Sequence, residues 1–413
     1  MSRQPAPRAA STTVRAHAPD YLLLTVVIVL SVIGLIAVYS SSYVLGEAQF
    51  RDANYFVKKQ SIFLVMGFVL MFAAMRFPYR HLMRLSPLLM LGTLVALALV
   101  LIPGIGIEQN GARSWIAMPS PLPPLQPSEL AKLAVLIYLA AWLSAKGEVL
   151  HDVSLGVIPF VGMVGVVSAL IILEPDVGTA VMVAGITGVL FFVAGARMFH
   201  VLVLGMSGLV TVFMLILAGG YRMDRITAFL DAESDPSGVG FHAIQLLVAF
   251  GSGGFTGVGL GVSRQKFFYV PGSHTDGVLA IIGEELGFIG VAVVMGLFLL
   301  LLYRGFLIAR RADTQFGSLI AMGVLAWIAI QMLINVGGVT RLLPLTGIPL
   351  PFISYGGSAL LSLFLAAGVL LSVSRYTAVT VAEAAPEPRG MRRPAGPVGP
   401  ARRPSLPTSG GAR

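Results

Sequence analysis

The chain has 413 residues, of which 56% are hydrophobic and 11% are charged. A soluble domain carries roughly 25% charged residues, so this composition excludes a soluble globular protein and indicates a chain solvated by lipid. The net charge of +9 does not indicate a nucleic-acid partner, because the basic residues stand in short loops and tails between apolar runs, where membrane orientation explains them. Cysteine is absent, which excludes disulfides and thiolate metal sites.

A membrane-spanning helix needs roughly 20 apolar residues. This criterion predicts an all-α polytopic membrane protein with about ten spans, near residues 21–41, 57–75, 85–102, 129–144, 154–172, 177–195, 198–219, 277–303, 317–338 and 355–376. The polar N-terminal segment, 1–19, lacks the short apolar core and cleavage site of a signal peptide. The last segment, 377–413, becomes rich in Pro, Gly and Arg, so we expect it to be disordered.

The Lys and Arg residues between the spans predict the orientation. With both termini in the cytoplasm, about twice as many of them fall inside as outside, which is the usual bias of cytoplasmic loops. The membrane domain is then 20–376, and its longest connection, about 220–275, lies on the outer face. A glycine-rich stretch within it, 251–261, matches no nucleotide-binding pattern, so we expect a flexible re-entrant or interfacial segment.

Two charged residues, Glu129 and Lys132, lie inside the predicted fourth span. An ionisable group there costs several kcal/mol unless it is paired or hydrated. Their spacing places both on one helix face. They could neutralise each other as an ion pair, or line a hydrated cavity in which Lys132 meets a phosphate. We favour the cavity.

Acidic residues near other span ends also have two interpretations. Asp176 follows Pro175 and is expected to cap the next helix through the amide of Thr179. Glu284 and Glu285 are adjacent, so their side chains point about 100° apart and at most one faces a given cavity. A structural hydrogen-bonding role and a functional role are equally compatible with this pair.

Asp276 stands where the outer connection meets the eighth span. An acid at this position could simply cap the helix that follows. It also lies at a membrane–water boundary near several cations. A carboxylate in that setting is suited to accept a proton from a hydroxyl group as a general base.

Six segments carry recognisable motifs in a fixed order: Gln126-Pro-Ser-Glu-Leu-Ala-Lys132, Leu173-Glu-Pro-Asp-Val-Gly-Thr-Ala180, Gly251-Ser-Gly-Gly254, Gln265-Lys266 with His274-Thr-Asp276, Ile282-Gly-Glu-Glu-Leu-Gly-Phe288 and Pro349-Leu-Pro-Phe-Ile-Ser-Tyr-Gly-Gly-Ser358. Together, over about 20–376, they resemble the SEDS family (shape, elongation, division, sporulation), whose members include FtsW, RodA and SpoVE. The opening segment, Asp20 to Ser42, is more similar to the FtsW and SpoVE branch than to RodA.

The resemblance implies a peptidoglycan glycosyltransferase that polymerises lipid II, an undecaprenyl-pyrophosphate disaccharide-peptide, on the outer face of the cytoplasmic membrane. The essential aspartate of the family falls on Asp276, and its QPSE…K element falls on Glu129 and Lys132. The chain departs from the family at Arg113, which stands one place early, and at Gly272, where the usual glutamate is missing. An acid at position 272 is therefore not essential in this chain.

The implied reaction joins a sugar hydroxyl to an anomeric carbon and expels lipid pyrophosphate, so it needs a base and cations. We assign Asp276 as the base. The predicted substrate-binding residues are Lys132, Glu129, Arg113, Lys59, Arg264, Lys266, His274 and Glu285. A Mg or Mn ion could share the charge of the pyrophosphate, although no pattern of metal ligands is present.

Two other functions are weighed against polymerisation. A lipid II flippase would use the intramembrane charges as a path, yet the spans show no inverted repeat. A non-catalytic scaffold leaves those charges unexplained. The resemblance further implies two kinds of partner: a monofunctional class B penicillin-binding transpeptidase and the membrane proteins of the division machinery. It places the protein at the division septum, with a RodA-type elongation polymerase as the alternative role.

Overall fold

The computed structural model describes residues 16–109, 112–118, 124–217, 221–233, 238 and 240–377. Its α-helices are α1 (Tyr21–Phe50), α2 (Tyr55–Arg76), α3 (Arg80–Val100), α4 (Pro127–Ser144), α5 (Ile158–Leu173), α6 (Val177–Val193), α7 (Met198–Leu217), α8 (Tyr221–Leu230), α9 (Phe241–Gly253), α10 (Val278–Arg311), α11 (Gln315–Val339) and α12 (Gly357–Ser374). Short turns η1 (Gly147–His151) and η2 (Val153–Val157) precede α5, and β1 (Gly106–Gln109) pairs with β2 (Ala112–Ile116). The all-α class is confirmed. Most of the predicted tails, 1–19 and 377–413, lies outside the described residues.

Within the described residues, nine helices are long and apolar enough to cross a membrane. The sixth predicted span, 177–195, corresponds to α6, whose 17 residues fall short of the roughly 20 that a full crossing needs. The helix α10 differs in the opposite direction. It has 34 residues, more than the roughly 20 that a crossing needs, and it is interrupted at Gly287.

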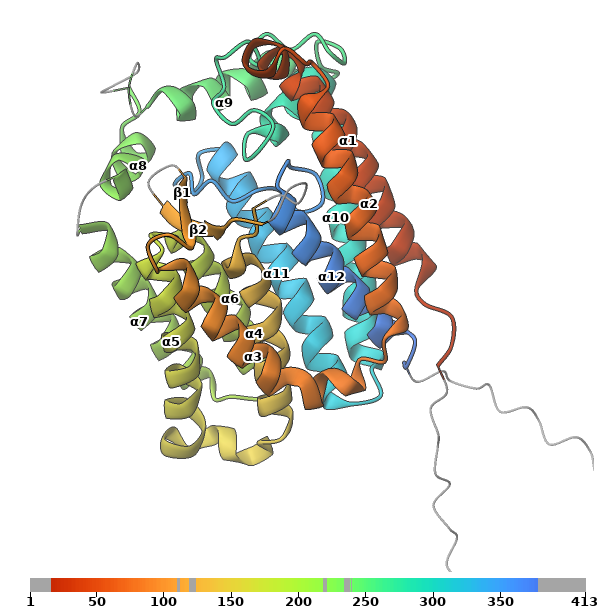
Figure 1. Cartoon of the computed structure of the whole chain (residues 1–413), viewed down its shortest axis with the longest axis vertical. Helices are drawn as coiled ribbons and strands as arrows, with labels where there is room; N and C mark the ends of the chain where they lie inside the picture. The colour runs from red at the N-terminus through yellow and green to blue at the C-terminus, as the bar shows by residue number, and fades with distance from the viewer. Residues whose placement is uncertain are drawn as a thin grey trace, which may run out of the picture. The chain divides into compact units, whose positions relative to one another are not determined.

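The connections gather at two ends of the helix bundle (Figure 1). The first, which we call the loop end, carries the β-hairpin, α8 and α9. The second, which we call the terminal end, carries the segment before α1, the end of α12 and the turns η1 and η2. There Arg304 Nη2 lies 2.6 Å from Asp20 Oδ2, and His17 N donates to Arg375 O at 2.9 Å. The two chain segments that enter and leave the bundle are thus joined to it.

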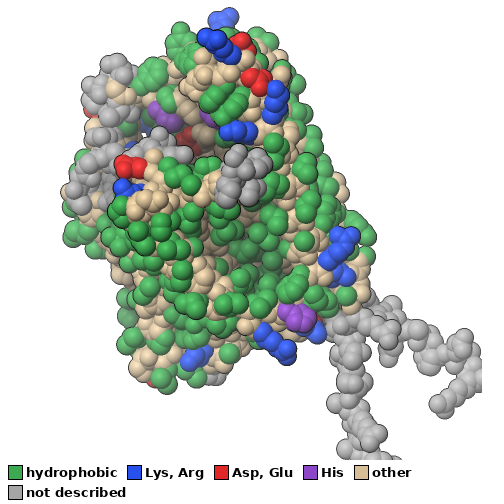
Figure 2. All heavy atoms as spheres, viewed as in Figure 1, with side chains coloured by type: hydrophobic (Ala, Val, Ile, Leu, Met, Phe, Trp, Pro, Cys, Tyr) green, Lys and Arg blue, Asp and Glu red, His purple; other side chains and the backbone are tan. Residues whose placement is uncertain are grey.

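The most buried helices are α4, α11 and α12, and they form the centre of the bundle. The helix α12 packs against α2, and α4 packs against α3, α6 and α11. At the periphery, α7 packs against α6 and leaves most of its apolar side chains exposed. A helix that is apolar on all sides is suited to lipid. Figure 2 shows this apolar flank, with Lys and Arg gathered toward the two ends.

A break near the start of α10 explains the glycine-rich stretch. Gly287 adopts φ 65° and ψ −163°, so the helix is interrupted there. The segment after α9 lies against the break, and Val258 N donates to the Glu284 carbonyl at 3.0 Å. A Cβ on Gly257 would lie only 2.1 Å from the Glu285 carbonyl oxygen. The glycines therefore permit close backbone docking, which corrects the prediction of a flexible segment.

Candidate active site

Asp276 lies at the loop end, just before α10 begins. Its backbone is held by α11, because the buried amide of Asn335 donates to the carbonyl oxygens of Asp276 and Ile348, both at 2.9 Å. The carbonyl of the nearby His274 accepts a hydrogen bond from Tyr355 N at 2.9 Å. Two segments that are distant in sequence thus hold the turn that carries Asp276.

The carboxylate of Asp276 does not cap α10. The N-cap residue is Gly277, which has no side-chain cap. Asp276 Oδ1 accepts from Thr275 Oγ1 at 3.0 Å, and Oδ2 has no hydrogen bond within the described part of the chain. Gly272 has a φ of 63°, and a Cβ there would stand 2.5 Å from Asp276 Oδ1. The glycine therefore leaves the carboxylate the space that it occupies.

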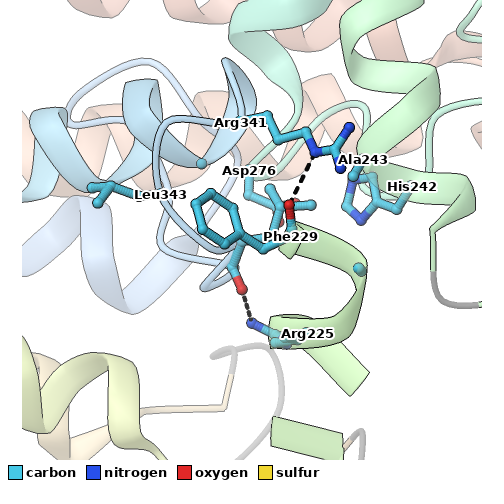
Figure 3. Close-up of a pocket in the computed structure, with 11 residues that line it drawn as sticks. Arg225, Phe229, His242, Ala243, Asp276, Arg341 and Leu343 are labelled. Carbon is cyan, nitrogen blue, oxygen red and sulfur yellow. Dashed lines mark hydrogen bonds between the residues drawn. The ribbon is translucent and has the colours of Figure 1, made fainter. Parts of the chain in front are cut away.

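Asp276 borders a cavity of about 160 Å³ (Figure 3). Its polar lining consists of Arg225 from α8, His242 from α9, Arg341 after α11 and Asp276 itself; its apolar lining includes Ala228, Phe229, Ala243, Leu343 and Leu345. Arg225 Nη1 donates to Leu345 O at 2.9 Å, and Arg341 Nε donates to Phe229 O at 3.2 Å. These bonds direct two guanidinium groups to the cavity that holds the carboxylate. We call it the Asp276 cavity.

Burial controls the protonation of two histidines near Asp276. It lowers the pKa of His274 to about 4, against the opposing effect of the Asp276 charge. Burial also lowers the pKa of His242. Within the described residues, Nδ1 of His274 and Nε2 of His242 are buried without a hydrogen-bond partner. Both rings are therefore neutral at pH 7, and each keeps one nitrogen whose hydrogen-bonding capacity is not used.

Glu129 and Lys132 form an ion pair inside α4. Lys132 Nζ lies 2.8 Å from Glu129 Oε1, and the two side chains are 2% and 7% exposed. The ammonium also lies 5.0 Å from the centre of the Trp327 ring, and Ser362 Oγ donates to Glu129 Oε2 at 3.3 Å. Protein atoms therefore enclose the pair, which corrects the expectation of a hydrated cavity. The assignment of both residues to substrate binding stays a prediction.

A second buried group of charges joins the loop after α9 to α10. Lys266 Nζ lies 3.0 Å from Glu285 Oε1, and Ser40 Oγ donates to Glu285 at 2.7 Å. The neighbouring Glu284 accepts from Ser263 Oγ at 2.5 Å and from the Arg264 backbone N at 2.9 Å. We call these residues the Glu284–Glu285 cluster. Both acids have structural partners here, while the predicted substrate role of Lys266 and Glu285 stays a prediction.

The remaining predicted residues lie at the loop end but do not line the Asp276 cavity. Lys59 Nζ donates to Tyr55 Oη at 2.6 Å. Arg113, on β2, lies 3.8 Å from Glu108 of the paired strand. The side chain of Arg264 is exposed. His274 packs against the rings of Phe56 and Tyr355, with centroid distances of 4.5 Å and 5.4 Å.

The cavity also contains residues that the sequence interpretation did not assign to the site, namely Arg225, His242 and Arg341. Both arginines lie outside the membrane in the predicted orientation. The usable signal was their position, since each stands at the outer end of a span on the same side as Asp276. His242 had no distinguishing signal. In contrast, the expected cap by Asp176 is confirmed, because Oδ1 accepts from Thr179 N at 2.9 Å.

The predicted Mg or Mn ion does not fit the lining of the Asp276 cavity. Hard divalent cations prefer several oxygen ligands, mainly carboxylates. Asp276 is the acid among the lining residues, and its charged neighbours Arg225 and Arg341 cannot ligate a cation. Within the described residues, no group of three or more His, Cys, Asp and Glu side chains could hold a metal. The proposed reaction therefore uses side chains of this chain and contains no step on a metal ion.

Comparisons with known proteins agree with this architecture. Residues 20–379 match the family model described as cell cycle protein, FtsW/RodA/SpoVE. Stage V sporulation protein E of Bacillus subtilis is 46% identical over 365 residues, which cover 88% of this chain and 99% of that protein. A probable peptidoglycan glycosyltransferase FtsW of Trichlorobacter lovleyi is 42% identical over 355 residues, covering 86% of this chain and 93% of the relative.

Two solved structures share the fold. One is a chain from a structure described as the structural coordination of polymerization and crosslinking by a peptidoglycan synthase complex, with a TM-score of 0.71, 31% identity and coverage of 87% of this chain and 98% of that one. The other is the rod shape determining protein RodA of Thermus thermophilus, with a TM-score of 0.64, 29% identity and coverage of 87% and 97%. The chain therefore belongs to the FtsW/RodA/SpoVE family of peptidoglycan glycosyltransferases and is an integral protein of the cytoplasmic membrane.

Proposed function

We propose that this chain polymerises lipid II into glycan strands, with Asp276 as the general base. The observation that carries the proposal is the Asp276 cavity. It places a carboxylate with an unused oxygen beside two directed guanidinium groups at one end of a membrane bundle. Its relatives include proteins named as probable peptidoglycan glycosyltransferases. A base and an anion site in one cavity are what this transfer needs.

The chemistry divides between these groups. Asp276 removes the proton of the acceptor hydroxyl, and that oxygen forms a bond to the anomeric carbon of the donor sugar. The bond from that carbon to the pyrophosphate breaks, and the lipid pyrophosphate leaves with the electron pair. Arg225 and Arg341 neutralise the leaving group, because guanidinium matches phosphate oxygens with two parallel N–H donors. Glu129, Lys132 and the other residues from the sequence interpretation remain predicted substrate contacts.

A purified system with labelled lipid II tests the proposal. A general base contributes about 10²–10⁴-fold, so Asp276→Asn should lose that much polymerisation while its thermal stability and lipid II binding stay close to wild type. The matched control is Asp231→Asn, an exposed acid of the same outer connection that does not line the cavity. Near-wild-type polymer from Asp276→Asn would refute the assignment. Lipid movement without any polymer from the wild type would favour a flippase.

We further propose that the loop end faces the outside and both termini face the cytoplasm, in line with the distribution of Lys and Arg. This chain lacks cysteine, so single cysteines report orientation. Glu233→Cys, exposed at the loop end, should react with an impermeant thiol reagent on intact spheroplasts, whereas Arg84→Cys, exposed near the terminal end, should react only after lysis. The reverse pattern would invert the topology.

The proposed partner is a monofunctional class B penicillin-binding transpeptidase, together with membrane proteins of the division machinery at the septum. Support comes from the family resemblance and from the similarity to a chain of a peptidoglycan synthase complex. Co-purification of the tagged full-length chain with its cognate transpeptidase tests this pairing. If the chain instead co-purifies with the transpeptidase of cell elongation, the elongation role is assigned to it.

A further inference from the structure

A second cavity lies at the terminal end, on the opposite side of the bundle from Asp276. It measures about 160 Å³ and lies between the segment before α1, the last turns of α10 and the end of α12. Its polar lining comprises His17, Asp20, Arg304, Arg311, Ser374 and Thr377. A cavity needs roughly 10–15 Å³ to hold one water molecule. This cavity is about ten times larger, so it has room for a phosphate group. We call it the terminal-end cavity.

The charges of this cavity are unbalanced in favour of an anion. Asp20 is already engaged, since Oδ1 accepts from Leu23 N at 2.9 Å and Oδ2 accepts from Arg304 Nη2 at 2.6 Å. Arg304 is thereby fixed in direction. Within the described residues, the guanidinium of Arg311 has no hydrogen bond or ion pair. Two arginines against one aspartate leave an excess positive charge, and guanidinium is the side chain best matched to phosphate oxygens.

The surroundings of the cavity supply the apolar half of a ligand. Leu307 and Ile308 contribute to its wall. On the same part of α10, Tyr303 and Phe306 are 59% and 44% exposed, on the flank that faces lipid. The cavity therefore lies where a membrane helix ends and phospholipid headgroups begin. Basic pockets between transmembrane helices at this depth are suited to anionic headgroups.

We propose that the terminal-end cavity binds the phosphate of an anionic phospholipid, with Arg311 as the principal contact and Arg304 as the second. His17 and Thr377 close the rim, since His17 Nε2 lies 2.9 Å from Thr377 Oγ1. The first and last described segments of the bundle thus meet at the lipid site. This inference is independent of the proposed polymerisation, because the cavity lies at the last turns of α10 whereas Asp276 stands just before the first.

The test uses the full chain in detergent and measures its melting temperature and lipid retention with phosphatidylglycerol, phosphatidylcholine or inorganic phosphate. Phosphatidylglycerol should stabilise the wild type, and the other two should not. Arg311→Gln removes a charge-assisted contact and should weaken phosphatidylglycerol binding roughly tenfold. Arg311→Lys should retain part of the binding, which shows that loss in Arg311→Gln is not misfolding.

The matched control is Arg310→Gln, the adjacent arginine, which does not line the cavity and whose guanidinium carbon lies 5.9 Å from the centre of the Phe306 ring. It should bind phosphatidylglycerol like the wild type. Equal losses in the Arg310 and Arg311 variants would overturn the site in favour of diffuse attraction to a charged surface. Equal stabilisation by inorganic phosphate would overturn the lipid assignment. Unchanged lipid binding by Arg311→Gln would overturn the assignment of Arg311 as the principal contact. The remaining role of Arg311 would be a favourable interaction with the end of the α10 dipole.

Discussion

The Asp276 cavity and the Glu284–Glu285 cluster both lie near the start of α10, yet they satisfy their polar groups differently. In the cluster, Glu285 receives hydrogen bonds from Ser40 and Lys266, and Lys266 also donates to the Gly261 carbonyl at 2.6 Å. In the cavity, Asp276 Oδ2 and His242 Nε2 have no such partner within the described residues. Buried polar groups are normally paired, so a ligand in this cavity can supply the bond that His242 Nε2 lacks and can donate to the unused Asp276 Oδ2.

The comparison separates structure from chemistry among residues of similar type. A closed cluster of charges holds a loop in place and gains nothing from a ligand, because its donors and acceptors are used. Unpaired polar groups in an open cavity lower the stability of the protein while no ligand is bound. They are suited to bind a charged substrate. If this distinction is right, changes in the cluster should mainly alter stability, and changes in the cavity should mainly alter activity.

The largest expected effect on stability is in the cluster. Lys266→Met would leave Glu285 buried without its counter-ion, and breaking such a pair costs about 3–5 kcal/mol. Chemical denaturation in detergent measures this loss. The control is Lys58→Met, because Lys58 and Asp52 lie 2.8 Å apart, as close as the buried pair at 3.0 Å, but are 63% and 35% exposed, and exposed pairs contribute about 0–1 kcal/mol. Equal losses in both variants would contradict a structural role for the cluster.

The Glu129–Lys132 pair tests whether a closed charge pair can also be functional. Lys132→Met alone should destabilise the protein by roughly 3 kcal/mol, because Glu129 is then buried and unpaired. Adding Glu129→Gln should restore most of the stability, since no lone charge remains. Polymerisation in that stable double variant decides the role. Activity that stays about tenfold below wild type would assign the pair a role in substrate binding, and full recovery would make the pair purely structural.

Much of the fold follows from local sequence signals. The spans follow from runs of apolar residues, and the Asp176 cap follows from an acid placed just before a helix start. The break at Gly287 and the docking of the glycine-rich segment could not be predicted, because they depend on the approach of two backbones that are distant in sequence. The same glycines, without that partner, are typical of flexibility.

The candidate site could be predicted only in part. Asp276 could be identified from the sequence because it belongs to a local motif, His274-Thr-Asp276. Arg225, His242 and Arg341 come from three separate segments that only the tertiary fold brings together. Charge alone could not rank Arg225 or Arg341 above Arg264 or Lys266, since all four are basic residues of the outer connections. Their position around the Asp276 cavity distinguishes them, and that position is a property of the folded structure.

A smaller effect, on activity, is expected from the cavity. Arg341→Gln should lower polymerisation about 10–100-fold, because one charge-assisted contact with phosphate is worth roughly 1.5–3 kcal/mol. Arg341→Lys should retain part of the activity through its charge. Arg264→Gln is the informative comparison, since Arg264 is exposed outside the cavity. A loss for Arg264→Gln and none for Arg341→Gln would favour the original sequence assignment over the cavity.

The smallest expected effect is a pH dependence of stability from His274. Its pKa of about 4 in the folded chain is below the ordinary value of 6.5, so the unfolded chain takes up the proton first as the pH falls. The contribution of His274 is therefore complete above about pH 6.5 and is lost progressively toward pH 4. His274→Phe keeps a ring against Phe56 and Tyr355 and has nothing to protonate, so its melting temperature should fall less between pH 7 and pH 5 than that of the wild type. His81→Gln, an exposed histidine at the terminal end, should keep the wild-type pH dependence. An identical decline in all three proteins would show that the unpaired nitrogen of His274 is not buried in the folded state.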